Sequence, residues 1–170
     1  GLPIVVKPND SGSSVGISIV KDPGELKKAV TDAFAYGSAA LLESYIDGRE
    51  LTVTILDGKA LPVVEIKPKN GFYDYNNKYQ KGNTEYIAPA VLDDHETLLV
   101  QLFAERAYKA CGCSSYARVD FRYDGKKFYF LEVNTLPGMT PLSLSPMAAK
   151  AAGMSFGQFL QGIIKSSLPQ

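Results

Sequence analysis

The chain has 170 residues, of which 45% are hydrophobic and 21% are charged, so its composition is that of a folded protein with a core. Its 18 basic and 18 acidic residues cancel, which argues against a general nucleic-acid binder or a binder of anionic membranes. Two cysteines, Cys111 and Cys113, are too few for a disulfide framework, and we expect free thiols in a reducing compartment. No apolar run is long enough to cross a membrane.

The first 20 residues predict two short strands around a loop rich in glycine and serine. An apolar strand over 2–6 ends in Lys7, the loop covers 9–16, and a return strand covers 17–20. Glycines let the backbone approach a ligand closely, and serine hydroxyls with free N–H groups can hold phosphate oxygens. A phosphate-binding loop beside Lys7 is one interpretation, and a plain hairpin turn is the other.

A helix and a further strand follow. Asp22 and Glu25 match the capping-box pattern that begins a helix, and Gly37 is expected to end it. The apolar spacing predicts a core face that includes Phe34. A mostly apolar strand is then predicted over 39–46.

Two acidic residues flank the next turn. Glu43 lies inside the strand just described, and Glu50 begins an alternating strand that an Asp-Gly turn joins to a partner strand over 60–66. A nucleoside pocket needs an apolar sandwich for the base, an acceptor for its amine and a carboxylate for the ribose, and this segment could supply all three. A hinge with solvated acids explains the same pattern.

The segment over 68–84 has no periodicity and contains several tyrosines, which favours a functional lid over disorder. Lys78 and Tyr79 are its candidates for reaching a ligand. A helix capped by Asp93 is expected to follow, and another capped by Ser155 is expected near the C-terminus. The side chains predicted on the buried face of the last helix are Phe156, Phe159, Leu160, Ile163 and Ile164.

Two alternating runs over 118–134 predict a hairpin that carries facing acids. If the hairpin closes around residues 125–127, Asp120 lies opposite Glu132, and Asn134 shares the face of Glu132. Facing carboxylates repel each other unless a cation lies between them, and Mg²⁺ takes a few protein oxygens together with substrate phosphates. The sequence therefore predicts a magnesium site here, with a solvated hairpin face of scattered charges as the alternative.

Taken together, these stretches resemble the ATP-grasp superfamily and, within it, the D-alanine–D-alanine ligases. The likeness covers essentially the whole chain, and its most specific part lies at 131–140. The matching stretches are IVVKP at 4–8, GSSVG at 12–16, LLESYIDGRELTV at 41–53, GFYDYNNKY at 71–79, ARVDF at 117–121 and LEVNTLPGMTPLSLSPMAA at 131–149.

The resemblance implies an α+β, ATP-grasp fold that holds part of the small lobe and a large C-terminal lobe with an antiparallel sheet. Residues 1–47 would belong to the small lobe and 48–170 to the large one, with a lid over 68–86. The N-terminal domain of the family would be absent from these residues.

The resemblance also implies roles for single residues. Lys7, Ser13 and Ser14 would contact the phosphates of ATP, and Lys78, which belongs to the closing loop with Tyr79, would also bind the nucleotide. Glu43, Tyr45 and Ile46 would line the adenine site, and Glu50 would bind the ribose. Asp120, Glu132 and Asn134 would hold two Mg²⁺ ions, with Mn²⁺ as an alternative metal. Catalysis would involve Ser13 and Tyr79, together with Arg118 and the backbone N–H of Gly138, which would stabilise negative charge on the reacting carboxyl. Arg118, Ser143 and Leu144 would bind substrate, the last two at the carboxylate of the second amino acid.

The implied reaction joins two D-alanines through an acyl phosphate and serves peptidoglycan precursor synthesis, and therefore cell-wall biogenesis and cell shape. Depsipeptide-forming relatives carry a histidine at the lid position, so Tyr79 favours an amine nucleophile, and Leu144 suits a methyl group better than a D-serine hydroxyl. We expect a cytoplasmic enzyme, homodimeric in its full-length form, with D-alanine as substrate and neither nucleic acid nor membrane as partner. The alternatives are another ATP-grasp carboxylate–amine ligase and a non-catalytic ATP-binding fragment.

Overall fold

The computed structural model describes residues 1–12, 14–69 and 84–168. Its backbone divides into two compact units. Gly1–Asp47 with Pro68–Glu85 form the first unit, and Gly48–Lys67 with Tyr86–Gln170 form the second. Both units combine helices with antiparallel strands, so the predicted α+β class is confirmed. None of the helices in the described ranges is long and apolar enough to span a membrane.

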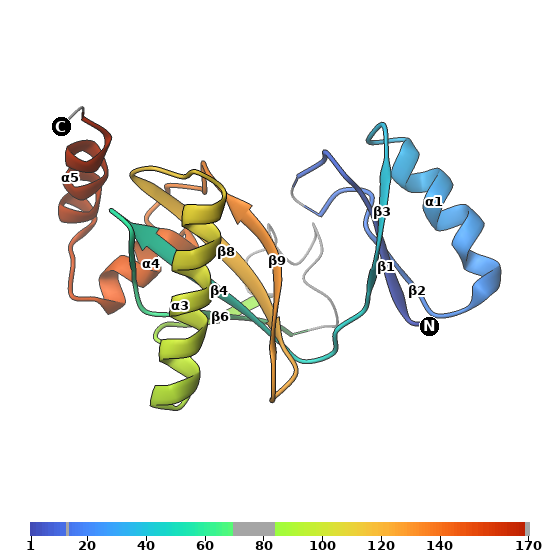
Figure 1. Ribbon diagram of the computed structural model, residues 1–170, viewed down its shortest axis with the longest axis horizontal. Coiled ribbons are helices and arrows are strands. Elements are labelled where there is room, and N and C mark those ends of the chain that lie inside the picture. Colours follow the sequence, from blue (N-terminus) through green and yellow to red (C-terminus); the bar gives the residue numbers. More distant parts are fainter. Residues whose placement is uncertain (13, 70–83, 169–170) are drawn as a thin grey trace. The chain divides into compact units, whose positions relative to one another are not determined.

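The first unit is a three-stranded antiparallel sheet with one helix against it (Figure 1). Its strands are β1 (Ile4–Pro8), β2 (Ser18–Val20) and β3 (Ala40–Ser44), in the order β2-β1-β3. The predicted capping box is present, but the helix opens with a 3-10 turn, η1 (Pro23–Glu25), before α1 (Leu26–Phe34). The core of this unit consists of Val6, Val20, Ala29 and Ala33.

One core prediction for this helix is wrong. Phe34 is 52% exposed, although it matches the apolar spacing of α1. It is the last residue of the helix, and the face that packs on the short sheet is formed by Ala29 and Ala33 together with the partly buried Leu26 and Val30.

The second unit is built on a six-stranded sheet in the order β7-β6-β4-β8-β9, with β5 paired to β4. The strands are β4 (Arg49–Leu56), β5 (Lys59–Ala60), β6 (Val64–Pro68), β7 (Thr84–Ile87), β8 (Tyr116–Tyr123) and β9 (Phe128–Asn134). The single strand predicted over 60–66 is wrong, because the chain forms β5 and β6 there with a break between them. Pro62 lies in the break, and a proline has no N–H to continue a ladder.

Helix α3 (Asp94–Ala110) covers one face of this sheet, as Figure 1 shows, and packs mainly on β4. The predicted capping box of Asp93 and Glu96 is present at its start. Glu96 also accepts a hydrogen bond from the Tyr123 hydroxyl, which ties the first turn of the helix to β8. The buried side chains of this layer are Leu51, Val53, Ile55, Val63, Val100, Ala104, Tyr108, Ala117, Val119, Phe121 and Tyr123.

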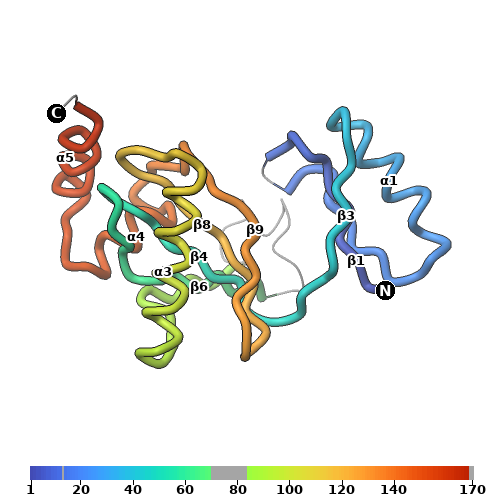
Figure 2. Tube along the Cα trace, viewed as in Figure 1, coloured from blue at the N-terminus to red at the C-terminus, as the bar shows by residue number. Residues whose placement is uncertain are grey.

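Two helices complete the second unit, α4 (Leu144–Ala151) and α5 (Phe156–Ser167). The trace in Figure 2 follows the chain from the β8–β9 hairpin through both of them. The predicted capping box of Ser155 is present, and Phe159 is fully buried. Phe156 is 36% exposed and Ile164 is 60% exposed, so their predicted places on the buried face are wrong, since a narrower stripe of α5 suffices to cover its neighbours.

Candidate active site

The large sheet has two chemically different faces, because side chains alternate along each strand. Leu51, Val53 and Ile55 of β4 enter the core under α3. The residues between them pair with β8 in the order Glu50 with Arg122, Thr52 with Asp120, and Thr54 with Arg118. Paired residues of antiparallel strands share a face, so this opposite face of the sheet carries a row of polar side chains.

The β8–β9 hairpin adds the second acid to this polar face. Asp120 lies opposite Glu132, as the sequence predicts, and Arg118 lies opposite Asn134. The route to this register differs from the prediction, because Tyr123 pairs with Phe128 at the hairpin end.

A register shift between Asp120 and Phe121 accommodates one extra residue of β9. Phe121 pairs with Phe130 and Asp120 with Glu132, so Leu131 is the extra residue. In an unbroken ladder counted from the hairpin end, Leu131 would face Asp120 and Glu132 would point into the core layer. The β-bulge therefore places Glu132 and Asn134 on the polar face.

Asp120 is the best-anchored acid of the site. It is 7% exposed, and its carboxylate accepts four hydrogen bonds. Thr52 Oγ1 donates to Oδ1 at 2.6 Å, and Arg118 donates Nε to Oδ1 at 2.9 Å and Nη2 to Oδ2 at 2.8 Å. Asn134 Nδ2 donates to Oδ2 at 2.9 Å. Because the donors come from three strands, the position and rotation of this carboxylate are both fixed.

Glu132 has a different environment. It is exposed, and its Oε1 accepts a bond of 3.2 Å from the same Asn134 nitrogen that donates to Asp120. Among the described residues, no ion pair involves Glu132, whereas Asp120 is paired with Arg118. The two carboxylates therefore lie within reach of one amide nitrogen, and in the part of the chain that the structure describes only Asp120 has a protein cation.

This donor set fits a hard divalent cation that also takes oxygens from phosphate or water. Within the described ranges, no group of three or more His, Cys, Asp or Glu side chains could hold a metal by itself. The protein contribution here is two carboxylates and an amide, which is the small number of ligands that Mg²⁺ sites with bound nucleotide use. Asn134 presents its amide nitrogen to both acids, and its oxygen is the atom that could act as a ligand.

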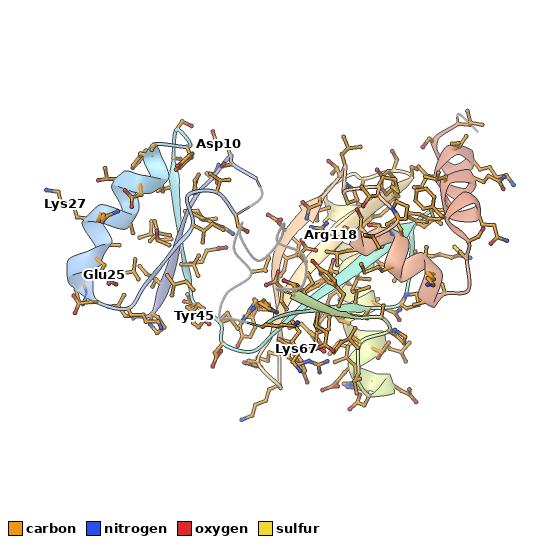
Figure 3. The ribbon with its side chains drawn as sticks, turned by 180° about the vertical axis from the view of Figure 1, so that it is seen from behind. Asp10, Glu25, Lys27, Tyr45, Lys67 and Arg118 are labelled. Carbon is orange, nitrogen blue, oxygen red and sulfur yellow. The ribbon has the colours of Figure 1, made fainter. Side chains whose placement is uncertain are left out.

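The residues predicted to contact nucleotide divide between the units. In the first unit Lys7 and Glu43 form an ion pair of 2.6 Å, between side chains that are 19% and 32% exposed. Tyr45 follows β3, and its N–H donates to Pro3 O at 3.1 Å (Figure 3 labels Tyr45). Ile46 is half-buried, and Ser14 has a positive φ of 59°, which is unusual for a non-glycine residue.

In the second unit, Glu50 lies 3.4 Å from Arg122, and both side chains are 13% exposed. Arg122 Nη2 also donates to Gly48 O at 2.8 Å, which ties the start of β4 to β8. The predictions for Ser13, Lys78 and Tyr79, and most of the lid over 68–86, lie outside the described residues.

The segment before α4 holds the remaining predicted residues. Ser143 is the N-cap residue of α4, but its side chain makes no cap bond. Its Oγ accepts from the Thr140 N–H at 3.1 Å and lies 2.9 Å from Thr140 Oγ1. A Cβ on Gly138 would approach this same Oγ to 3.2 Å, so a larger residue there would press on Ser143. Leu144 is buried.

Sequence reasoning missed Thr52, Thr54 and Thr140, which contact predicted site residues or their neighbours. The alternation of polar and apolar residues along β4 is visible in the sequence. It identifies Thr52 and Thr54 as site residues only once β4 is known to pair with β8, and no local sequence pattern indicates that pairing.

The family described as "D-ala D-ala ligase C-terminus" matches residues 1–165. The chain belongs to this family. Curated relatives named D-alanine–D-alanine ligase include one from Methylacidiphilum infernorum, which is 51% identical over 166 residues, 97% of this chain and 55% of the relative. The chain thus spans about half the length of the curated relatives it matches.

Solved ligase structures have the same fold. A D-alanine–D-alanine ligase from Bacillus anthracis superimposes with a TM-score of 0.86 at 43% identity, covering 98% of this chain and 55% of that one. The B. anthracis ligase complexed with ATP gives a TM-score of 0.83 at 41% identity, covering 98% and 54%. VanG D-Ala:D-Ser ligase from Enterococcus faecalis gives 0.86 at 35% identity, covering 98% and 50%. The ATP-grasp assignment made from the sequence is confirmed.

Proposed function

We propose that this chain is the ATP- and magnesium-binding part of an ADP-forming D-alanine–D-alanine ligase. The observation that carries the proposal is the pair of facing carboxylates, Asp120 and Glu132, on the polar sheet face beside Arg118. Membership of the ligase family supports the substrate assignment. We further propose that 1–47 is part of the small ATP-grasp lobe and 48–170 the C-terminal lobe, with 68–86 as the lid.

Magnesium would be held by Asp120, Glu132 and Asn134. Two ions are proposed because the family resemblance implies two. Glu132 is the more accessible acid for a metal, since it is exposed and has no protein cation among the described residues. When bound, the metal would neutralise phosphate charge during phosphoryl transfer. The chain's own contribution is to hold Asp120 through Thr52 and Asn134, so that little reorganisation is needed when nucleotide arrives.

A set of side chains is proposed to bind the nucleotide. The side chains proposed for it are Lys7, Ser13, Ser14, Glu43, Tyr45, Ile46, Glu50 and Lys78. Lys7 supplies a cation for phosphate oxygens, and its pairing with Glu43 holds the ammonium group in place. Glu50 supplies a carboxylate that can accept hydrogen bonds from ribose hydroxyls.

The proposed reaction needs no nucleophilic side chain. The carboxylate of the first D-alanine attacks the γ-phosphorus of ATP, and ADP leaves. The amine of the second D-alanine then attacks the acyl phosphate, the resulting tetrahedral oxyanion collapses, and phosphate leaves. Arg118 and the Gly138 N–H would stabilise the oxyanion, because oriented donors are worth most where negative charge develops. Tyr79 and the lid would exclude water, which would otherwise hydrolyse the acyl phosphate.

Ser143 and Leu144 would receive the second amino acid. A D-serine acceptor is the second candidate, because the chain is similar to a D-Ala:D-Ser ligase over 98% of its length. The buried Leu144 favours a methyl group over a hydroxyl, since an unpaired hydroxyl against an apolar side chain is costly. We therefore propose D-alanine as the preferred acceptor.

The test uses the complete polypeptide of which these residues form all or part. It is incubated with ATP, Mg²⁺ and D-alanine, and phosphate and dipeptide are measured, with L-alanine and D-serine in parallel. D-Alanyl-D-alanine with ADP and phosphate is expected. Turnover with L-alanine in place of D-alanine, or a faster mixed D-alanyl-D-serine product, would overturn the substrate assignment. We also propose that the complete polypeptide is a homodimer, which light scattering on the same preparation tests. Fractionation of the cells that produce it tests the proposed cytoplasmic location.

The metal assignment has its own variant. Glu132→Gln removes one charge from the proposed ligand set at an exposed position, so we expect phosphoryl transfer to fall by at least about a hundredfold with the fold retained. Ser167→Ala, on α5 at an exposed position, is the matched control and should retain normal turnover. Near-normal turnover of Glu132→Gln would refute the assignment.

A further inference from the structure

A buried pair of hydroxyl groups joins the large sheet to α4. Thr54 Oγ1 donates to Ser145 Oγ at 3.0 Å, and each residue is only 1% exposed. Thr54 lies in the middle of β4, and Ser145 lies in the first turn of α4, 91 positions further along the chain. The neighbours of Ser145 in that turn, Leu144 and Pro146, are buried and apolar. Buried hydroxyls in such surroundings are tolerated only when they are paired.

The start of α4 has no side-chain cap of its own. A serine at the N-cap usually accepts a hydrogen bond from the first turn. Ser143 does not, because its side chain is engaged by Thr140 instead. The first turn of α4 is therefore held by contacts from outside the helix. One of them is the hydrogen bond from Thr54 of β4 to Ser145.

Thr54 also lies next to the proposed catalytic residues on the polar face of the sheet. Thr54 is the direct cross-strand partner of Arg118, and Thr52, two residues earlier on the same face, holds Asp120. One strand thus contacts both the charged cluster and the first turn of α4. We propose that Thr54 is a positioning residue: through Ser145 it fixes the acceptor-binding start of α4 relative to Arg118.

This inference rests on the proposed function, because Ser143 and Leu144 are the residues proposed to receive the second D-alanine. Loss of the bond shifts or loosens the turn that carries them and leaves Arg118 and the metal ligands in place. Reaction rates fall steeply when reacting groups are displaced by as little as about 1 Å. The effect should therefore appear in the use of D-alanine and leave the binding of ATP unchanged.

The experiment compares Thr54→Val, which has nearly the same shape without the hydroxyl, with Thr54→Ser, which keeps it. Two quantities are measured on the complete polypeptide: amide hydrogen exchange over Ser143–Ala149, and the KM values for D-alanine and for ATP. For Thr54→Val we expect faster exchange in that segment and a KM for D-alanine raised about tenfold, with the KM for ATP unchanged. Thr54→Ser should restore both quantities.

A double variant separates positioning from stability. Thr54→Val leaves the Ser145 hydroxyl buried without its partner, whereas Thr54→Val/Ser145→Ala removes both hydroxyls and should recover most of the lost Tm. Its KM for D-alanine should stay raised, because the link between β4 and α4 is still missing. If Thr54→Val does not fold, this double variant carries the test. Ser166→Ala, which removes a partly buried hydroxyl from α5, is the matched control and should leave both KM values unchanged.

Two results overturn the inference alone. One is a KM for D-alanine within about twofold of the parent in both Thr54→Val and the double variant. The other is a parallel rise of both KM values, which would mean a general loss of structure. A parent polypeptide that forms no dipeptide refutes the proposed function and this inference with it. The two kinds of failure are distinguishable, because failure of the proposed function is seen in the parent polypeptide, before any substitution is made.

Discussion

Asp120→Asn is the substitution that best separates the structural role of the site from its proposed metal role. The side chain keeps its shape, but one carboxylate oxygen becomes an NH₂ group. Each oxygen of Asp120 accepts two hydrogen bonds, one of them from an Arg118 N–H, which cannot act as an acceptor. Whichever oxygen is replaced therefore loses at least its Arg118 bond and leaves that donor facing an NH₂ group. A lost hydrogen bond to a charged group costs about 1.5 kcal/mol or more, and a donor left unpaired costs a similar amount, so the expected loss of unfolding free energy is about 3 kcal/mol.

Glu132→Gln is the matched control, because it makes the same chemical change directly across the hairpin. Glu132 is exposed and accepts one long bond, so we expect its unfolding free energy to change by less than about 0.5 kcal/mol. Both variants should lose Mg²⁺-dependent ATP binding, since both remove a proposed ligand.

The assay is urea unfolding of the two variants and the parent, followed by circular dichroism without nucleotide or metal. The reasoning is refuted if Asp120→Asn unfolds within about 0.5 kcal/mol of the parent, or if the two variants are equally destabilised. The first result would mean that the four hydrogen bonds contribute little. The second would mean that repulsion between the facing acids, rather than hydrogen bonding, decides the stability of the cluster.

Three further predictions concern other parts of the chain. Gly48→Ala should destabilise the protein by more than about 2 kcal/mol in urea unfolding. The reason is that Gly48 has a φ of 132° and an added Cβ would lie 2.1 Å from Tyr123 O. A variant as stable as the parent would contradict this backbone geometry. The hydrogen bond to Glu96, followed by burial, raises the pKa of Tyr123 to about 12, so its contribution is complete below pH of about 10 and is lost as the pH rises through about 12. The stability difference between the parent and Tyr123→Phe should therefore shrink over that range in urea titrations, and a difference that grows with pH would be inconsistent. Lys7→Gln should weaken binding of a fluorescent ATP analogue at least about tenfold, since a charge-assisted phosphate contact is lost, and unchanged affinity would exclude Lys7 from the nucleotide site.

The site was only partly predictable from the sequence. The acids of the hairpin were predicted to face each other, and they do, but the ladder reaches that pairing through a bulge at Leu131 that the prediction did not contain. The turn residues fix where the hairpin closes, and the apolar face fixes which side chains enter the core. When the two disagree by one residue, the bulge reconciles them, and only packing against α3 decides where it forms.

The sequence by itself determined the local devices. The capping boxes at Asp22, Asp93 and Ser155 involve residues three positions apart, so their geometry follows from the helix alone. The alternation along β8 likewise determined which of its side chains share a face.

Tertiary structure decided which residues hold the site in place. Thr52 reaches Asp120 across 68 positions, and Thr54 reaches Ser145 across 91. These pairs exist because β4 lies beside β8 and under α4, an arrangement set by burying the opposite face of the sheet against α3. A buried threonine looks the same in the sequence whether it faces a core or an active site. Strand order decides which, because it determines the polar groups that each hydroxyl meets.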